Sequence, residues 1–226
     1  MLPYAPATVA EALLSLLDAA VAQRGLATLA IPGGRSPGPV LSELAQICTP
    51  FVRERLHLFW LDERAVPPLH PERNDAPTLA AWDAGGARPA GVYPMPAESA
   101  DLDAAALAYA DVVRRVSRGH PLDVVLIGIG EDGHLASLFP GHPGLRELSE
   151  CFAVTDSPKP PPRRLTLSLP IIHAARARIV LCLGRAKGLV YTRANRGPNE
   201  DCPISLLPSA GTVWYLDDAA VAGSQA

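Results

Sequence analysis

The sequence predicts an α/β fold in which a mainly parallel sheet lies between layers of helices. Short apolar runs alternate along the chain with stretches of helical periodicity, and this alternation is typical of a parallel sheet. The runs at 26–31, 56–61, 122–127 and 177–184 are largely apolar, as expected for strands buried on both faces. No repeat or linker divides the chain, so we expect a single domain over 1–226.

The first helix covers the N-terminal region and has recognisable ends. Thr8 is the expected N-cap, and Glu11 completes a capping box. Leucines and alanines recur at helical spacing to about Arg24, and Gly25 is the expected stop.

The next elements follow in order: a strand over 26–31, a helix over 39–47, a strand over 56–61, a long polar loop DERAVPPLHPERNDA, a helix capped by Asn74 or Asp75 that runs through Trp82, a short VYPMP segment, a helix over 101–118 and a strand over 122–127.

The second half of the chain continues this alternation after a glycine-rich loop. Its expected elements are FAVTD, a proline-rich loop SPKPPPRR, a strand RLTLSL that ends at Pro170, a short helix, a strand over 177–184, a helix over 185–195, the segment PISLL and a strand TVWYLD. The last residues, AAVAGSQA, are expected to form a frayed tail.

The composition indicates a soluble protein of ordinary enzyme size. The net charge of the 226 residues is -3, and no basic run accompanies an aromatic stripe, which excludes a nucleic-acid partner. Glu11 and Asp18 interrupt the apolar pattern of the N-terminus, which therefore reads as an amphipathic helix and not as a signal peptide. No run approaches the length of a membrane span. We expect a cytoplasmic protein with no membrane partner, and a monomer by default.

Cysteine and histidine spacing gives no sign of a metal site. The four cysteines are scattered, without a C-x-x-C pair: Cys48, Cys151, Cys182 and Cys202. Buried free thiols are expected rather than disulfides or zinc ligands. His57 and His70 have no second ligand at a suitable spacing, so no metal is predicted.

The loop GIGEDGHLASLFPG, over 128–141, is the strongest candidate for a site. Its glycines allow a sharp turn after a buried strand, and they place Asp132 and His134 where open α/β sheets carry their chemistry. A short helical piece is expected to follow and to end at Pro140 and Gly141. His134 would then lie near a helix start, whose positive end keeps the ring a neutral base.

The glycines of this loop also spell G-x-G-x-x-G, the fingerprint of dinucleotide-binding folds. That fingerprint requires a long helix after the third glycine, whereas Pro140 leaves room for about two turns. Glu131 and Asp132 would also set carboxylates beside a pyrophosphate. We therefore reject a dinucleotide cofactor.

The loop PGGRSPG after the first strand has two possible functional interpretations. Residues 34–38 fit G-x-S-x-G, the nucleophile elbow of serine hydrolases. That elbow uses the N–H group after the serine as an oxyanion donor, and Pro37 has none, so this reading fails. The alternative is a phosphate cradle made by Gly33, Gly34 and Ser36 at a helix N-terminus.

Charged residues at two further strand ends complete the candidate site. Asp62, Glu63 and Arg64 form either a local ion pair or a substrate clamp in which Arg64 faces an anion and a carboxylate holds it. The chain has only two lysines, Lys159 and Lys187. Lys187 lies in the first turn of a predicted helix, where it is suited to act as a point charge on phosphate.

Five segments together resemble the 6-phosphogluconolactonase family: GIGEDGHLASLFPG, LDERAVP with the later Asn74, PGGRSP, RLTLSLP and GRAKG, in the order expected. The resemblance covers nearly the whole chain. It implies a three-layer, modified Rossmann-like fold shared with sugar-phosphate isomerases and deaminases, and no required metal or cofactor. It also implies hydrolysis of 6-phospho-D-glucono-1,5-lactone to 6-phosphogluconate in the oxidative pentose phosphate pathway.

One departure from the family pattern concerns the first loop, which in the family is closer to SGGSTP. Here PGGRSP places Arg35 where a small hydroxyl residue is common. The loop therefore contacts phosphate either through its backbone alone or with an added guanidinium, and both remain open.

The expected mechanism assigns a role to each candidate residue. His134 takes a proton from the water that attacks the lactone carbonyl, and Asp132 orients the imidazole. Arg64 or backbone N–H groups stabilise the oxyanion. Gly33, Gly34 and Ser36 hold the phosphate together with Lys187, and Arg64 is a further candidate for this contact. Asp62 also belongs to the catalytic set. For Asp62 and for Asp132, which on so tight a loop could instead bond the backbone, a chemical and a structural role are both open.

Two alternatives belong to other classes. Glucosamine-6-phosphate deaminases resemble the chain in DE and DGH, but they use a glutamate five residues after the histidine, where this chain has Phe139. They also tend to carry tyrosine where this chain has Arg64. A non-catalytic sugar-phosphate sensor would need an attached DNA-binding segment, for which we see no spare residues.

Overall fold

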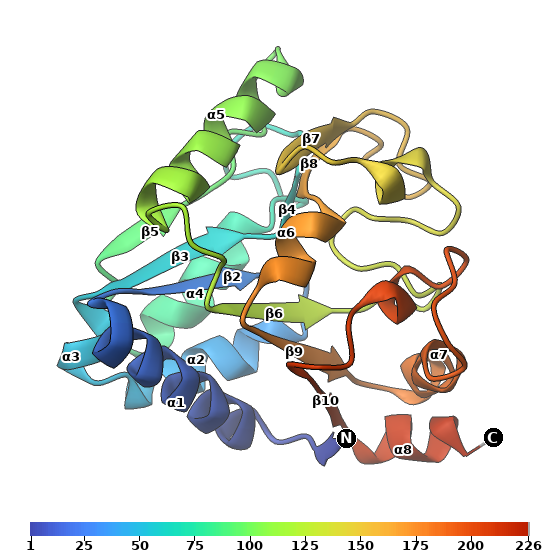
Figure 1. Ribbon diagram of the computed structural model, residues 1–226, viewed down its shortest axis with the longest axis horizontal. Helices are drawn as coiled ribbons and strands as arrows, with labels where there is room; N and C mark the ends of the chain where they lie inside the picture. The colour runs from blue at the N-terminus through green and yellow to red at the C-terminus, as the bar shows by residue number, and fades with distance from the viewer. Residues whose placement is uncertain (226) are drawn as a thin grey trace.

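A computed structural model describes residues 1–225 and contains a seven-stranded sheet in which every pairing is parallel (Figure 1). The strand order is β1-β10-β9-β6-β2-β3-β5. The bounds of these strands, in the order of the chain, are β1 Leu2–Pro3, β2 Ala27–Ile31, β3 Leu56–Trp60, β5 Gly91–Tyr93, β6 Val124–Gly128, β9 Ala177–Cys182 and β10 Thr212–Leu216. The predicted α/β class with a mainly parallel sheet is confirmed, and the short VYPMP segment supplies an edge strand.

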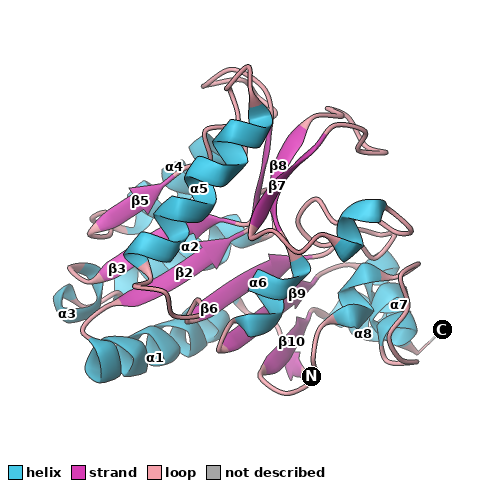
Figure 2. Ribbon diagram, turned by 45° about the horizontal axis from the view of Figure 1, so that its top comes forward, coloured by secondary structure: helices cyan, strands magenta, loops and turns pink. Residues whose placement is uncertain are grey.

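Helices cover both faces of this sheet, which gives the predicted three layers (Figures 1 and 2). One face carries helices that pack on one another in sequence, α1 Pro6–Arg24, α2 Pro37–Ile47 and α4 Asp75–Gly85, with the short α3 Pro50–Arg53 beside α1. The other face carries α5 Leu102–Val116 and α6 Leu169–Ala174. Near β9 and β10, α7 Arg185–Ala194 packs against α8 Asp218–Ser224.

A second, antiparallel sheet of three strands lies beside the carboxyl edge of the first. It consists of β4 Asp62–Arg64, β8 Arg164–Leu167 and β7 Cys151–Val154, in that order. Leu61 joins the two sheets, because its N–H donates to Ile31 while its carbonyl accepts from Leu167. The prediction that DER begins a polar loop was therefore wrong: these residues form a strand.

Three further local predictions were wrong. Helix α1 begins at Pro6, whose ring suits a first helical position, and Ala5 rather than Thr8 is the N-cap, without a side-chain bond. The residues after His134 form no helix; isolated bridges pair Leu135 with Ile129 and with Leu138. Residues 219–224 of the predicted tail belong to α8, whose N-cap Asp217 accepts a hydrogen bond from the N–H of Ala220, and Ala226 lies outside the described residues.

The predicted convergence of loops at one edge is confirmed. Strands β9, β6, β2 and β3 are consecutive in the sheet and all parallel, so the loops that leave their carboxyl ends are neighbours. Gly25, the predicted stop of the first helix, has φ of 76° and accommodates the left-handed turn that leads into β2. All four cysteines are buried and free, as expected. No helix within residues 1–225 is long and apolar enough to cross a membrane.

Tyr109 of α5 completes the sheet where its edge strand stops. Its buried hydroxyl accepts a hydrogen bond from the N–H of Trp60 at 2.8 Å and lies 3.1 Å from the carbonyl of Tyr93. Trp60 is the last residue of β3, directly ahead of the junction at Leu61. The hydroxyl therefore fixes the strand end from which β4 departs.

We predict that Tyr109→Phe destabilises the protein by about 1–3 kcal/mol, because it leaves the buried N–H of Trp60 without a partner. Urea denaturation measures this loss. Tyr191→Phe is the matched control, because the Tyr191 hydroxyl makes no hydrogen bond within residues 1–225. Equal midpoints for the two variants would contradict the role assigned to Tyr109.

Candidate active site

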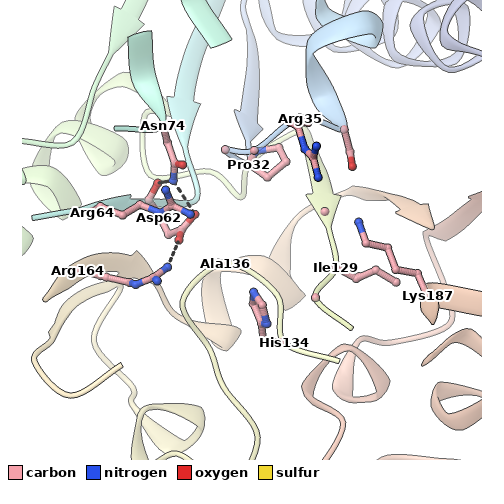
Figure 3. A pocket seen from close by; sticks show the side chains of 15 residues that line it. Pro32, Arg35, Asp62, Arg64, Asn74, Ile129, His134, Ala136, Arg164 and Lys187 are labelled. Atoms are coloured by element: carbon pink, nitrogen blue, oxygen red, sulfur yellow. Dashed lines mark hydrogen bonds and ion pairs between the residues drawn. The ribbon is translucent and has the colours of Figure 1, made fainter. Parts of the chain in front are cut away.

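A cavity of about 270 Å³ opens at the carboxyl edge of the parallel sheet (Figure 3). It is lined by residues from six parts of the chain: Pro32, Gly33, Gly34, Arg35, Ser36, Asp62, Arg64, Asn74, Gly128, Ile129, Gly130, His134, Ala136, Arg164 and Lys187. Eight of the nine predicted site residues are in this set; Asp132 lies behind the lining, against His134. A concave site of this size with several polar groups suits a small polar ligand.

His134 and Asp132 form a close pair on the loop after β6. The Nδ1 atom of His134 lies 2.5 Å from Oδ1 of Asp132, and the N–H of His134 also donates to that oxygen at 3.2 Å. Since Nδ1 is engaged by the carboxylate, Nε2 is the ring nitrogen that remains for chemistry. Burial alone would raise the pKa of Asp132, but hydrogen bonds from His134 and Lys159 outweigh it and hold that pKa well below its usual range.

The position of the ring is set by a glycine and a phenylalanine, not by a helix. A Cβ atom on Gly130 would lie 2.0 Å from Nδ1 of His134, so only glycine leaves room for the pair. The ring of Phe139 packs against the imidazole, with centroids 4.9 Å apart. Because no helix begins at His134, the predicted effect of a helix dipole on this ring was wrong.

Asp62 is held by hydrogen bonds from two different loops. Its Oδ2 accepts from the hydroxyl of Ser137 at 2.7 Å, and its Oδ1 accepts from the side chain of Asn74 at 3.3 Å. The Arg164 guanidinium stands 3.9 Å away, and Asp62 is buried (Figure 3). These contacts give Asp62 a clear role in holding the cavity wall together.

Glu63, next to Asp62, anchors the N-terminus of α4. Its side chain accepts hydrogen bonds from the N–H groups of Arg64, Asn74 and Asp75 at 2.7–2.9 Å. Burial raises the pKa of Glu63 to about 7. The N–H groups of Asn74 and Arg64 and the Arg73 guanidinium act in the opposite direction, because they stabilise the carboxylate. The anchor fixes Asn74, whose side chain then reaches Asp62.

The loop that leaves β2 carries the predicted phosphate cradle. Gly34 has φ of 85°. Ser36 is the N-cap of α2, but its side chain makes no capping hydrogen bond. The Ser36 hydroxyl and the helix N-terminus are thus both available to an anion. Arg35 lines the cavity from this loop, and Lys187 from α7 lines it opposite Asn74 and Arg64 (Figure 3).

The lining carries an excess of positive charge. Three arginines and one lysine face a single carboxylate: Arg35, Arg64, Arg164 and Lys187 against Asp62. Burial lowers the pKa values of Lys187 and Arg164, as expected for cations withdrawn from water. The cavity is therefore suited to an anionic ligand.

Three residues at this site were missed by sequence reasoning. Arg164 begins the apolar strand RLTL and is buried; in the sequence, the available signal was an arginine at the start of an otherwise apolar strand. Asn74 was considered only as a helix cap and a family marker. Lys159 contacts both Asp132 and His134, and its rarity was the only hint. Within residues 1–225, no three His, Cys, Asp or Glu side chains gather so as to hold a metal ion.

Comparison with known proteins gives consistent matches over nearly the whole chain. The family described as glucosamine-6-phosphate isomerases/6-phosphogluconolactonase matches residues 5–215. A 6-phosphogluconolactonase of Mycobacterium leprae is 38% identical over 226 residues, covering 93% of this chain and 90% of its own. The 6-phosphogluconolactonase structure from Thermotoga maritima matches with a TM-score of 0.85 at 22% identity, over 96% and 97% of the two chains. A monomeric glucosamine-6-phosphate deaminase matches with a TM-score of 0.77 at 18% identity, over 99% and 98%.

We predict that Gly33→Ala disrupts the cavity wall. A Cβ atom there would lie 1.8 Å from Oδ1 of Asn74, so the Asn74 side chain must leave its buried hydrogen bonds to Asp62. The expected loss of unfolding free energy is about 2–4 kcal/mol by chemical denaturation. Gly38→Ala, in the same segment, is the control, because its Cβ would meet only Ala81 at 3.8 Å. Similar stabilities for the two variants would contradict the close approach at Gly33.

Proposed function

The chain belongs to the glucosamine-6-phosphate isomerase/6-phosphogluconolactonase family as a lactone hydrolase, and we propose that it converts 6-phospho-D-glucono-1,5-lactone to 6-phosphogluconate with His134 as the base. The observation that carries this proposal is the His134–Asp132 pair at the wall of a positively charged cavity. This reaction would place the protein in the oxidative pentose phosphate pathway.

The chemistry needs a base, an oxyanion donor and a grip on phosphate. Nε2 of His134 removes a proton from water as the water attacks the lactone carbonyl, a contribution of about 10²–10⁴ in rate. The imidazolium then returns this proton to the ring oxygen as the bond between C1 and that oxygen breaks. Asp132 fixes the tautomer through Nδ1 and stabilises the imidazolium that forms. Arg64 and Arg164, which line the same side of the cavity as Asp62, are the cations that we assign to the developing oxyanion (Figure 3).

The phosphate binds, in this proposal, at the opposite side of the cavity. Gly33, Gly34 and Ser36 offer backbone and hydroxyl donors at the start of α2, and Lys187 adds a point charge. Arg35 faces the same space, which favours an added guanidinium contact over a backbone contact alone. All these groups come from one chain, so a single-domain monomer would be sufficient for activity.

Phe139 favours lactone hydrolysis over deamination. It is buried and packs against the His134 ring, so it fills the place where a further carboxylate would have to stand. Asp132 is consequently the only carboxylate that contacts His134 within residues 1–225. One acid is sufficient for a base that activates water, whereas opening a sugar ring and shifting a proton demands more acid–base groups.

We predict that His134→Ala lowers kcat/KM on freshly prepared lactone by about 10²–10⁴-fold, because the base is lost. Acid release at constant pH measures turnover. His142→Ala is the matched control: His142 also pairs with a carboxylate, Asp156, at 2.9 Å, but it lies outside the cavity. Near-wild-type turnover by the His134 variant would refute its assignment, and turnover of glucosamine 6-phosphate by the parent protein would favour the deaminase.

The phosphate role of Lys187 has its own test. Lys187→Ala should raise KM for the phosphorylated lactone at least tenfold more than KM for unphosphorylated gluconolactone, because only the former presents a dianion to the ammonium. Steady-state kinetics on both substrates measures the ratio. An equal effect on the two KM values would reject this contact.

A further inference from the structure

Both lysines of this lysine-poor chain lie at the candidate site. Lys187 lines the cavity, whereas Lys159 lies outside the lining and contacts the pair behind it. Its Nζ atom is 2.9 Å from Oδ2 of Asp132 and 3.3 Å from Nδ1 of His134. The ammonium, the carboxylate and the imidazole thus form a contiguous three-member cluster.

The segment that carries Lys159 is fixed in place by its own hydrogen bonds. The hydroxyl of Ser157, a buried residue, donates to the Lys159 carbonyl at 2.8 Å and accepts from the Lys159 N–H at 3.2 Å. The guanidinium of Arg164 donates to the carbonyls of Lys159 and Pro160 at 2.9 and 3.1 Å. This backbone anchoring brings the Lys159 side chain to Asp132 although the side chain itself remains 42% exposed.

The charge of Asp132 creates a difficulty for a base. A carboxylate 2.5 Å from Nδ1 stabilises the protonated ring, and a protonated ring cannot take a proton from water. A cation bound to the second oxygen of the same carboxylate reduces this stabilisation of the protonated ring, while the hydrogen bond at Nδ1 is kept. Arg164, which stands over Phe139, and the cavity cations Arg35, Arg64 and Lys187 act in the same direction from farther away, and Asp62 and Glu131 act against them.

We propose that Lys159 is a positioning residue of the reaction: its ammonium holds the Asp132 carboxylate and opposes protonation of the His134 ring. This rests on the proposed function of His134 as the base. Lysine suits the role because a compact ammonium binds one carboxylate oxygen and leaves the other to the imidazole. Arginine retains the charge and should substitute for it.

The pH dependence of kcat/KM is the decisive measurement. Loss of the cation favours the protonated ring, so the acidic limb of the profile should move to higher pH in Lys159→Met, by about one pH unit at this half-exposed site. Below the limb, kcat/KM should then be about tenfold lower than wild type, and above it the two should converge. Lys159→Arg should keep the wild-type limb.

Controls separate this role from a structural one. Arg163→Met removes a charge from the same segment without touching Asp132 and should leave the limb in place. A uniform loss of kcat/KM in Lys159→Met with an unmoved limb would overturn the proposal, and so would an equal shift in the Arg163 variant. Lys159→Gln repeats the test with a polar side chain in case the methionine variant folds poorly.

A second readout does not depend on turnover. NMR titration of ¹⁵N-labelled histidine, with the His134 signals assigned from a His134→Gln sample, should show the ring of Lys159→Met titrating at higher pH than in wild type. An unchanged titration would overturn the inference even in an active enzyme. Absence of lactonase turnover in the wild type would instead refute the proposed function, and the NMR shift would still report on Lys159.

Discussion

The cavity depends on a single buried carboxylate that joins segments distant in sequence. Asp62 accepts hydrogen bonds from Ser137, on the loop that carries His134, and from Asn74, at the start of α4. Its neighbour Glu63 fixes the same helix terminus through three N–H groups. Both acids sit where they do because the chain leaves one sheet at Leu61 and enters another. The cavity walls are therefore set by strand connectivity first and by side-chain charge second.

Close packing of glycines supplies the second constraint. At Gly33 and Gly130 a methyl group would strike the side chains of Asn74 and His134, which both line the cavity. Neither of these glycines has a positive φ, so backbone freedom is not the reason for them. The reason is space. The glycines of the two loops allow functional side chains to approach a neighbouring backbone more closely than any other residue would permit.

Sequence reasoning predicted the parts of the fold that depend on local pattern. The apolar strands and the convergence of their loops followed from periodicity and from the geometry of parallel sheets. Sequence reasoning failed for segments whose secondary structure is decided by tertiary contacts. Asp62–Arg64 is a strand only because Arg164–Leu167 pairs with it, and the residues after His134 turn back onto Ile129 rather than coil. Lys159 and Arg164 were missed for the same reason, since only the folded loop brings Lys159 to Asp132.

The fold does not separate hydrolysis from deamination, because solved structures of a 6-phosphogluconolactonase and of a glucosamine-6-phosphate deaminase both match it. In the proposed function, the side chains around His134 make that choice. The imidazole has one carboxylate on Nδ1, an ammonium beside that carboxylate, and the apolar face of Phe139 against its ring. Within residues 1–225, Asp132 is therefore the only carboxylate in contact with the ring. In the proposed reaction, such a base takes a proton from the attacking water and returns it to the ring oxygen as the C1–O bond breaks, which is all that opening a lactone requires. Substituting a carboxylate for Phe139 would place an acid in a fully buried position beneath Arg164, so the apolar residue is also what the local packing favours.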